Sequence, residues 1–114
     1  MITNFKIFEM KNENENWNMI LDISNIWSDS LYENNNELIS FNDKYINFLN
    51  KNKNNIIGKI SNESWNDLEV LLNRLNENKE DISKSTSIWD DIYDWADSNN
   101  VQIKVEKEEI KKDF

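Results

Sequence analysis

Four aspartates are the residues of this chain whose type and spacing are most suggestive of chemistry. They lie in residues 85–103, a stretch without lysine or arginine: Asp90, Asp91, Asp94 and Asp97. At about 100° per residue on a helix, Asp90, Asp94 and Asp97 fall within about 60° of one another, and Asp91 lies about 60° further on. No cation one turn away neutralises them, so the stripe is either a solvated helix face or a contact surface for the lysines and arginines of a partner.

Asp90, Asp91 and Asp94 also match the pattern D-D-x-x-D, in which carboxylates one helical turn apart can share a magnesium ion. Prenyl-diphosphate and terpene synthases use this pattern, but they are much longer and need a second metal motif. The match covers five residues of 114, so we expect neither a metal site nor another cofactor.

Five tryptophans, at positions 17, 27, 65, 89 and 95, are many for this length. All fall on the apolar faces of predicted helices, which makes the core their default place. Tryptophan is also enriched among the residues that dominate protein interfaces. Trp89 lies toward the edge of its apolar face and is therefore the candidate anchor for a partner.

A second candidate patch is basic. Residues 44–62 contain no acidic residue and four lysines: Lys44, Lys51, Lys53 and Lys59. This patch either contacts an acidic surface or a few phosphates of a partner, or is a solvated loop.

Missing residue types exclude several kinds of active site. The chain has no histidine, cysteine or proline and a single glycine, Gly58. It can form no disulfide, zinc finger, thiol nucleophile, imidazole general base or glycine-rich phosphate loop. We therefore expect a binding protein rather than an enzyme.

The charge of the chain indicates the kind of partner. Asp plus Glu is 22 against 13 for Lys plus Arg, a formal net charge of -9. Because phosphate backbones and anionic membranes attract cations, we expect no direct binding to nucleic acid or membrane and favour a basic protein. The 22 asparagines and 15 isoleucines are typical of an AT-rich genome. Without a signal-peptide pattern or an apolar run of about 20 residues, the expected location is the cytoplasm.

The apolar pattern predicts three strands and four helices in the order β-α-α-β-α-α-β. Strands are expected at 3–10, 56–60 and 101–105, and helices at 17–32, 38–49, 65–78 and 87–97. The second helix has two possible starts, because Ser40 and Asp43 form a capping pattern that would begin it only at Phe41.

These elements predict an α+β fold, with α/β as the alternative, in which a small three-stranded sheet packs against about four helices. Helices between the strands favour some parallel pairing. Residues 1–106 are expected to form one domain and residues 107–114 a charged tail, because a chain of this length supports one core.

Small size, strong acidity and absence of cysteine give the chain a resemblance to two groups of inhibitors. These are the immunity proteins that neutralise nuclease toxins and the anti-CRISPR or anti-restriction proteins of phages. The element order is similar to that of the barstar family of ribonuclease inhibitors, although no motif aligns and no residue role carries over. The resemblance implies inhibition of a nuclease toxin or CRISPR effector through its nucleic-acid-binding surface.

A second function remains open from the sequence. Aromatic-rich helices also suit a structural or adaptor subunit that docks into a larger assembly. Salt separates the two functions, since electrostatic binding weakens as salt rises and an apolar interface hardly changes. The sequence does not fix the oligomeric state.

Overall fold

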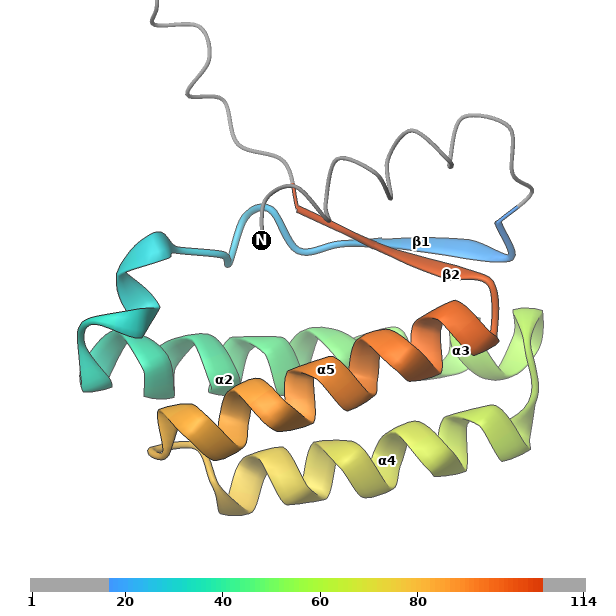
Figure 1. Ribbon diagram of the computed structural model, residues 1–114. Coiled ribbons are helices and arrows are strands. Elements are labelled where there is room, and N and C mark those ends of the chain that lie inside the picture. Colours follow the sequence, from blue (N-terminus) through green and yellow to red (C-terminus); the bar gives the residue numbers. More distant parts are fainter. Residues whose placement is uncertain (1–16, 106–114) are drawn as a thin grey trace, which may run out of the picture.

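The computed structural model describes residues 17–105. In this part of the chain, strand β1 (Met19–Asp22) is followed by a 3₁₀ helix, four α-helices and strand β2 (Val101–Lys104). The helical elements are η1 (Asp29–Tyr32), α2 (Asn35–Lys51), α3 (Lys53–Lys59), α4 (Asn62–Glu77) and α5 (Ile82–Ser98). Figure 1 shows the two strands side by side on one side of the helices.

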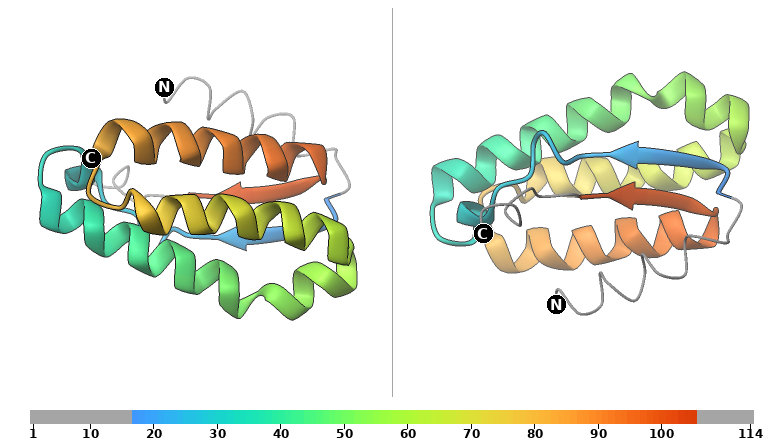
Figure 2. Two further views of the ribbon diagram at one scale, coloured as in Figure 1. Left: turned by 90° about the horizontal axis from the view of Figure 1, so that it is seen from below. Right: turned by 90° about the horizontal axis from the view of Figure 1, so that it is seen from above.

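The sheet is a parallel pair. Met19 lies opposite Val101, and Leu21 lies opposite Ile103. These four side chains are buried, whereas the residues between them point outward and are partly or fully exposed. This two-residue alternation places one face of the sheet on the helices, with α2 along the β1 side and α5 along the β2 side (Figure 2, right).

The helices form the layer beneath the sheet. α4 runs between α5 on one side and α2 with α3 on the other (Figure 2, left). Their buried side chains recur every three or four residues, as with Leu68, Leu72 and Leu75 of α4, so each helix presents one apolar stripe. These stripes and the inner face of the sheet share one hydrophobic core.

A buried polar cluster ties α2 to the start of α5. The Asn42 side-chain amide donates to the Ser85 hydroxyl and to the Lys79 carbonyl, both at 3.0 Å, and its oxygen accepts from the Trp89 indole N–H at 3.1 Å. The Ser85 hydroxyl donates onward to the Asn78 carbonyl at 2.9 Å. Asn42 and Ser85 are fully buried, so these bonds replace the water that both side chains lose on folding.

The mixed helix-and-strand class is confirmed, but the three-stranded order is only partly matched. Helices were correctly predicted within α2, α4 and α5, and a strand within β2. α2 begins at Asn35, capped by Asn34, so Ser40 lies inside the helix and caps nothing. α5 begins at Ile82, capped by Asp81, five residues before the predicted start at 87.

The predicted helix over 17–32 is wrong. The chain there forms β1, a turn and η1. Met19, Leu21 and Ile23 also alternate at strand spacing, and all three are buried. β2 supplies the backbone partners that make the strand the stable choice, and the Asp22 carboxylate, which accepts from the Ser24 N–H at 2.9 Å, turns the chain out of the sheet.

The predicted strand over 56–60 is also wrong, because these residues fall in and just after helix α3. A short apolar run cannot be assigned to helix or strand from its pattern alone. Ile56 is buried and Ile60, four residues later, packs against the same core, which is helical spacing. The described residues therefore hold two strands. The remaining predicted strand, over 3–10, and the charged tail over 107–114 lie outside them.

Candidate binding surface on helix α5

The outer side of α5 carries three of the four predicted aspartates. Ile92 and Ala96 of the same helix face the core and are buried. Asp90, Asp94 and Asp97 lie on the opposite side and are exposed, as the helical spacing predicts. We call these three residues the acidic face. None of them forms an ion pair with the rest of the chain from 17 to 105.

Asp91 does not belong to this face. Its Oδ2 lies 3.5 Å from Nη1 of Arg74, a residue of α4, and both side chains are about half exposed. Residues 85–103 do lack a cation, but the expectation of four uncompensated carboxylates is wrong because Arg74 of the neighbouring helix pairs with Asp91. An exposed pair of this kind is worth about 0–1 kcal/mol, yet it neutralises Asp91 as a contact for a partner.

Trp89 is not an exposed anchor either. Its side chain is only 4% exposed. Its indole N–H is used by Asn42, and its ring packs edge-on against Phe41 with 5.3 Å between centroids. The edge of the apolar face, where the sequence places Trp89, is covered by η1 and α2 in the folded chain. The candidate anchor Trp89 is therefore a core residue.

The residue that covers Trp89 is one that the sequence did not single out. Tyr32 of η1 stands edge-on to Trp89, with centroids 6.1 Å apart, and is itself 50% exposed. Trp27, partly buried, lies 6.4 Å from both rings and donates its indole N–H to Asp29 at 3.2 Å. The sequence interpreted this segment only as part of the helix over 17–32, which the structure does not contain. That interpretation predicted no contact between Tyr32 and α5.

Asp90 links the acidic face to these aromatic side chains. The pKa of Tyr32 is raised by partial burial and by the negative charges of Asp90 and Asp29. Burial, the nearby Tyr32 and Asp90 raise the pKa of Tyr93 to about 12. Asp90 thus acts on two phenols from two elements. We call Trp27, Tyr32 and Tyr93 the aromatic rim of the acidic face.

The helix that carries the acidic face is fixed at several points. Trp95 donates its indole N–H to the Ser64 carbonyl at 2.8 Å, which fastens α5 to α4. Asn100, just after α5, has a φ of 59°, a left-handed conformation that asparagine tolerates, and leads directly into β2. The three carboxylates therefore stand on a preorganised scaffold.

The second candidate patch, Lys44, Lys51, Lys53 and Lys59, lies elsewhere. All four lysines are exposed on α2 and α3. Lys53 lies over the Trp65 ring at 5.8 Å, and Lys51 and Lys59 occupy the last turns of their helices, where a positive charge is favourable. Since α3 and α5 lie on opposite sides of α4, the patch is not continuous with the acidic face (Figure 2, left).

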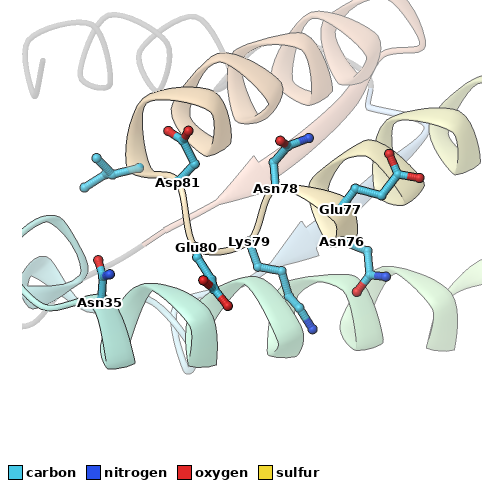
Figure 3. A pocket seen from close by; sticks show the side chains of 8 residues that line it. Asn35, Asn76, Glu77, Asn78, Lys79, Glu80 and Asp81 are labelled. Atoms are coloured by element: carbon cyan, nitrogen blue, oxygen red, sulfur yellow. The ribbon is translucent and has the colours of Figure 1, made fainter.

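An open hollow of about 590 Å³ lies where the α4–α5 loop meets the start of α2 (Figure 3). Asn35 and residues 76–82 line it. Lys79 pairs with Asp43 at 2.8 Å, and Asp81 accepts from the Lys84 N–H as the cap of α5. These polar groups hold the loop in place. The hollow is at the N-terminal end of α5, whereas the acidic face runs from the middle of this helix to its last turn.

Neither a metal centre nor a membrane span is found between residues 17 and 105. Asp90, Asp91 and Asp94 do not converge, since Asp91 turns toward Arg74, and no group of three acidic side chains is arranged to hold a metal ion there. Within the same residues, no helix is both long and apolar enough to cross a bilayer.

Comparison with known proteins adds no relative. The chain matches no family model, and no curated protein or solved structure matches it. The features that bear on function are the acidic face, its aromatic rim and the charge of the chain.

Proposed function

We propose that this chain is a non-catalytic acidic binding protein that inhibits a basic nucleic-acid-handling protein by occupying its nucleic-acid-binding surface. A CRISPR effector or a nuclease toxin has the required basic surface. The observation that carries the proposal is the acidic face, Asp90, Asp94 and Asp97, exposed on one side of α5 without an ion pair in the described chain. Charge complementarity supplies the attraction.

The acidic face offers a partner what a phosphate backbone offers. Its carboxylates follow one another at roughly 6 and 5 Å along the helix axis, given a rise of 1.5 Å per residue. Lysines and arginines that bind regularly spaced phosphates can contact such a row. The net charge of -9 adds long-range steering, which raises the association rate and weakens as salt is added.

Preorganisation supports this role. α5 is capped by Asp81 at its start, fastened to α4 through Trp95 and continued into β2 after Asn100. A partner therefore does not have to order the helix on binding, and that ordering cost is saved. The carboxylate side chains lose their own rotamer freedom, but the backbone that spaces them is already fixed.

The adaptor function receives less support. The large apolar side chains that are exposed in residues 17–105 are Ile20, Tyr32 and Val70, which come from three different elements. A docking subunit normally presents a contiguous apolar patch. Of the tryptophans that suggested such a subunit, Trp65, Trp89 and Trp95 are buried in the core.

The test compares two variants of equal charge in a pull-down from nuclease-treated host lysate. One variant is Asp90→Asn with Asp94→Asn and Asp97→Asn. The control is Glu63→Gln with Glu69→Gln and Glu77→Gln, which removes three exposed charges from α4. We expect the wild type and the control to recover one basic nuclease or effector at low salt, and the first variant to lose it.

Inhibition is then measured directly. The purified target should bind its nucleic acid less tightly when this protein is present. Recovery that survives high salt, or equal binding by both triple variants, would contradict the proposal and favour the adaptor function. The proposal also implies a cytoplasmic location, where nucleases and effectors meet their nucleic acids; fractionation of expressing cells checks it.

For the fold, we infer that residues 3–10 add the third strand to the β1–β2 pair. Phe5 and Ile7 alternate with Lys6 at strand spacing, and each edge of a two-stranded sheet has backbone groups that a further strand can pair. Hydrogen exchange at residues 3–10 tests this, with slow amides expected at alternate positions.

A further inference from the structure

Tyr32 is an exposed aromatic side chain held in a fixed position. Trp89 and Trp27 both contact its ring at a steep angle, with centroids 6.1 and 6.4 Å away, while half of the side chain remains open to solvent. Aromatic rings that are rigid before binding lose little entropy when a partner packs on them, which is why tyrosine is enriched at interfaces. This makes Tyr32 a better anchor than any other exposed side chain near the acidic face.

The electrostatic surroundings of Tyr32 select the charge of that partner. Asp90 follows directly after Trp89, whose ring contacts Tyr32, and Asp29 lies in the same short helix as Tyr32. The two negative charges add to partial burial in raising the pKa of the phenol. Asp90 forms no ion pair with residues 17–105. A phosphate or carboxylate would be repelled, and an apolar group would strip water from Asp90 without replacing its hydrogen bonds. A cationic group satisfies the carboxylate and attracts the electron-rich ring at once.

We propose that Tyr32 and Asp90 together form the binding site for one arginine side chain of the basic partner. The guanidinium stacks on the Tyr32 ring and donates an N–H to Asp90. This inference rests on the proposed function and names the residue type that the surface selects. Arginine fits better than lysine because its planar, weakly hydrated guanidinium stacks on rings while its N–H groups still reach a carboxylate.

The test uses two probes of equal charge, a peptide of nine arginines and a peptide of nine lysines. Binding to the full chain is followed by two-dimensional NMR of the tryptophan indole N–H signals. The Trp27 signal is identified from Trp27→Phe. We expect the arginine peptide to bind roughly two- to fivefold more tightly, the ratio that an exposed cation–π contact supplies, and to shift the Trp27 signal more.

Variants at position 32 separate stacking from charge. Tyr32→Phe keeps the ring and should keep the preference for arginine, whereas Tyr32→Leu keeps bulk without a ring and should bring the ratio close to one. Val70→Leu, a change at an exposed apolar position of α4, is the matched control and should leave the ratio unchanged. Thermal unfolding checks that each variant is folded.

Equal binding of the two peptides by the wild type would overturn the proposed arginine-binding site. A preference for the arginine peptide that persists in Tyr32→Leu would do the same. The proposed function is judged separately by the triple aspartate variant, which should weaken both peptides and the lysate target together. A chain that retains its target but shows no preference for arginine would keep the function and lose this inference.

Discussion

At the scale of single residues, burial decides which side chains stabilise the fold and which remain for binding. Trp89, Asn42 and Ser85 satisfy one another's polar groups inside the protein, while Tyr32 and Asp90 stay at the surface above them. The interior set positions the exposed set, because Tyr32 packs on Trp89.

Replacing the buried amide should destabilise the protein strongly. Asn42→Ala leaves the Trp89 indole N–H and the Lys79 carbonyl without these hydrogen bonds and opens a small cavity. We expect the free energy of unfolding to fall by about 2–4 kcal/mol, measured by urea denaturation. Asn47→Ala, at an exposed position of the same helix, should change it by less than about 0.5 kcal/mol. Equal effects of the two changes would show that the cluster contributes no stability.

Tyr93 should make the fold sensitive to alkali. Its pKa is raised from 10.0 to about 12 by burial, Tyr32 and Asp90, so between these pH values the unfolded chain is deprotonated while the folded chain keeps the proton. The free energy of unfolding should fall by up to about 2 kcal/mol as pH rises through this window, and the stability is fully present below pH 10. Tyr45, whose pKa burial also raises, adds to this loss.

The difference between the wild type and Tyr93→Phe, measured by urea denaturation from pH 9 to 12, isolates the Tyr93 contribution. The variant should lose less stability over that range. Parallel curves for the two proteins would mean that the phenol is as well solvated in the folded chain as in the unfolded one.

At the scale of elements, the periodicity of apolar residues correctly predicted the long helices. α2, α4 and α5 each repeat an apolar stripe over about four turns, which local spacing reveals without knowledge of the fold. Two of the short segments, β1 and α3, were predicted wrongly. Their patterns suit either a helix or a strand. The state of β1 depends on pairing with β2, which lies far away in the sequence, and that of α3 on packing against α4, the next helix of the chain.

The acidic face should cost α5 some stability. Asp97 lies in the last turn of α5, where the helix dipole disfavours a negative charge. Asp97→Asn should therefore raise the free energy of unfolding by about 0.3–1 kcal/mol at low salt while weakening binding to the basic target. Urea denaturation and the pull-down measure the two effects. A loss of stability in this variant would instead assign Asp97 a structural role.

At the scale of the whole molecule, negative charge is spread over the surface with little internal compensation. The net charge is -9, and the ion pairs described are Arg74–Asp91 and Lys79–Asp43, both partly exposed. Such pairs contribute little, whereas mutual repulsion of the carboxylates opposes compaction. The acidity therefore does not stabilise the fold, and under the proposed function it attracts the basic partner.

Salt should therefore stabilise the free protein even as it weakens the complex. Raising NaCl from about 0.05 to 0.5 M screens the repulsion and should increase the free energy of unfolding by on the order of 1 kcal/mol. The triple aspartate variant, which lacks the acidic face, should gain less. A decrease with salt would mean that attractive pairs, rather than repulsion, dominate the electrostatics of the fold.

The sequence by itself determined the charge, the absence of thiols and imidazoles, the three long helices, strand β2 and the placement of Asp90, Asp94 and Asp97 on one side of α5. These properties depend on composition or on neighbours within one or two turns. Only the tertiary structure decided the rest. It buried Trp89, paired Asp91 with Arg74 and placed Tyr32 beside α5, because each of these contacts joins elements that local spacing cannot relate.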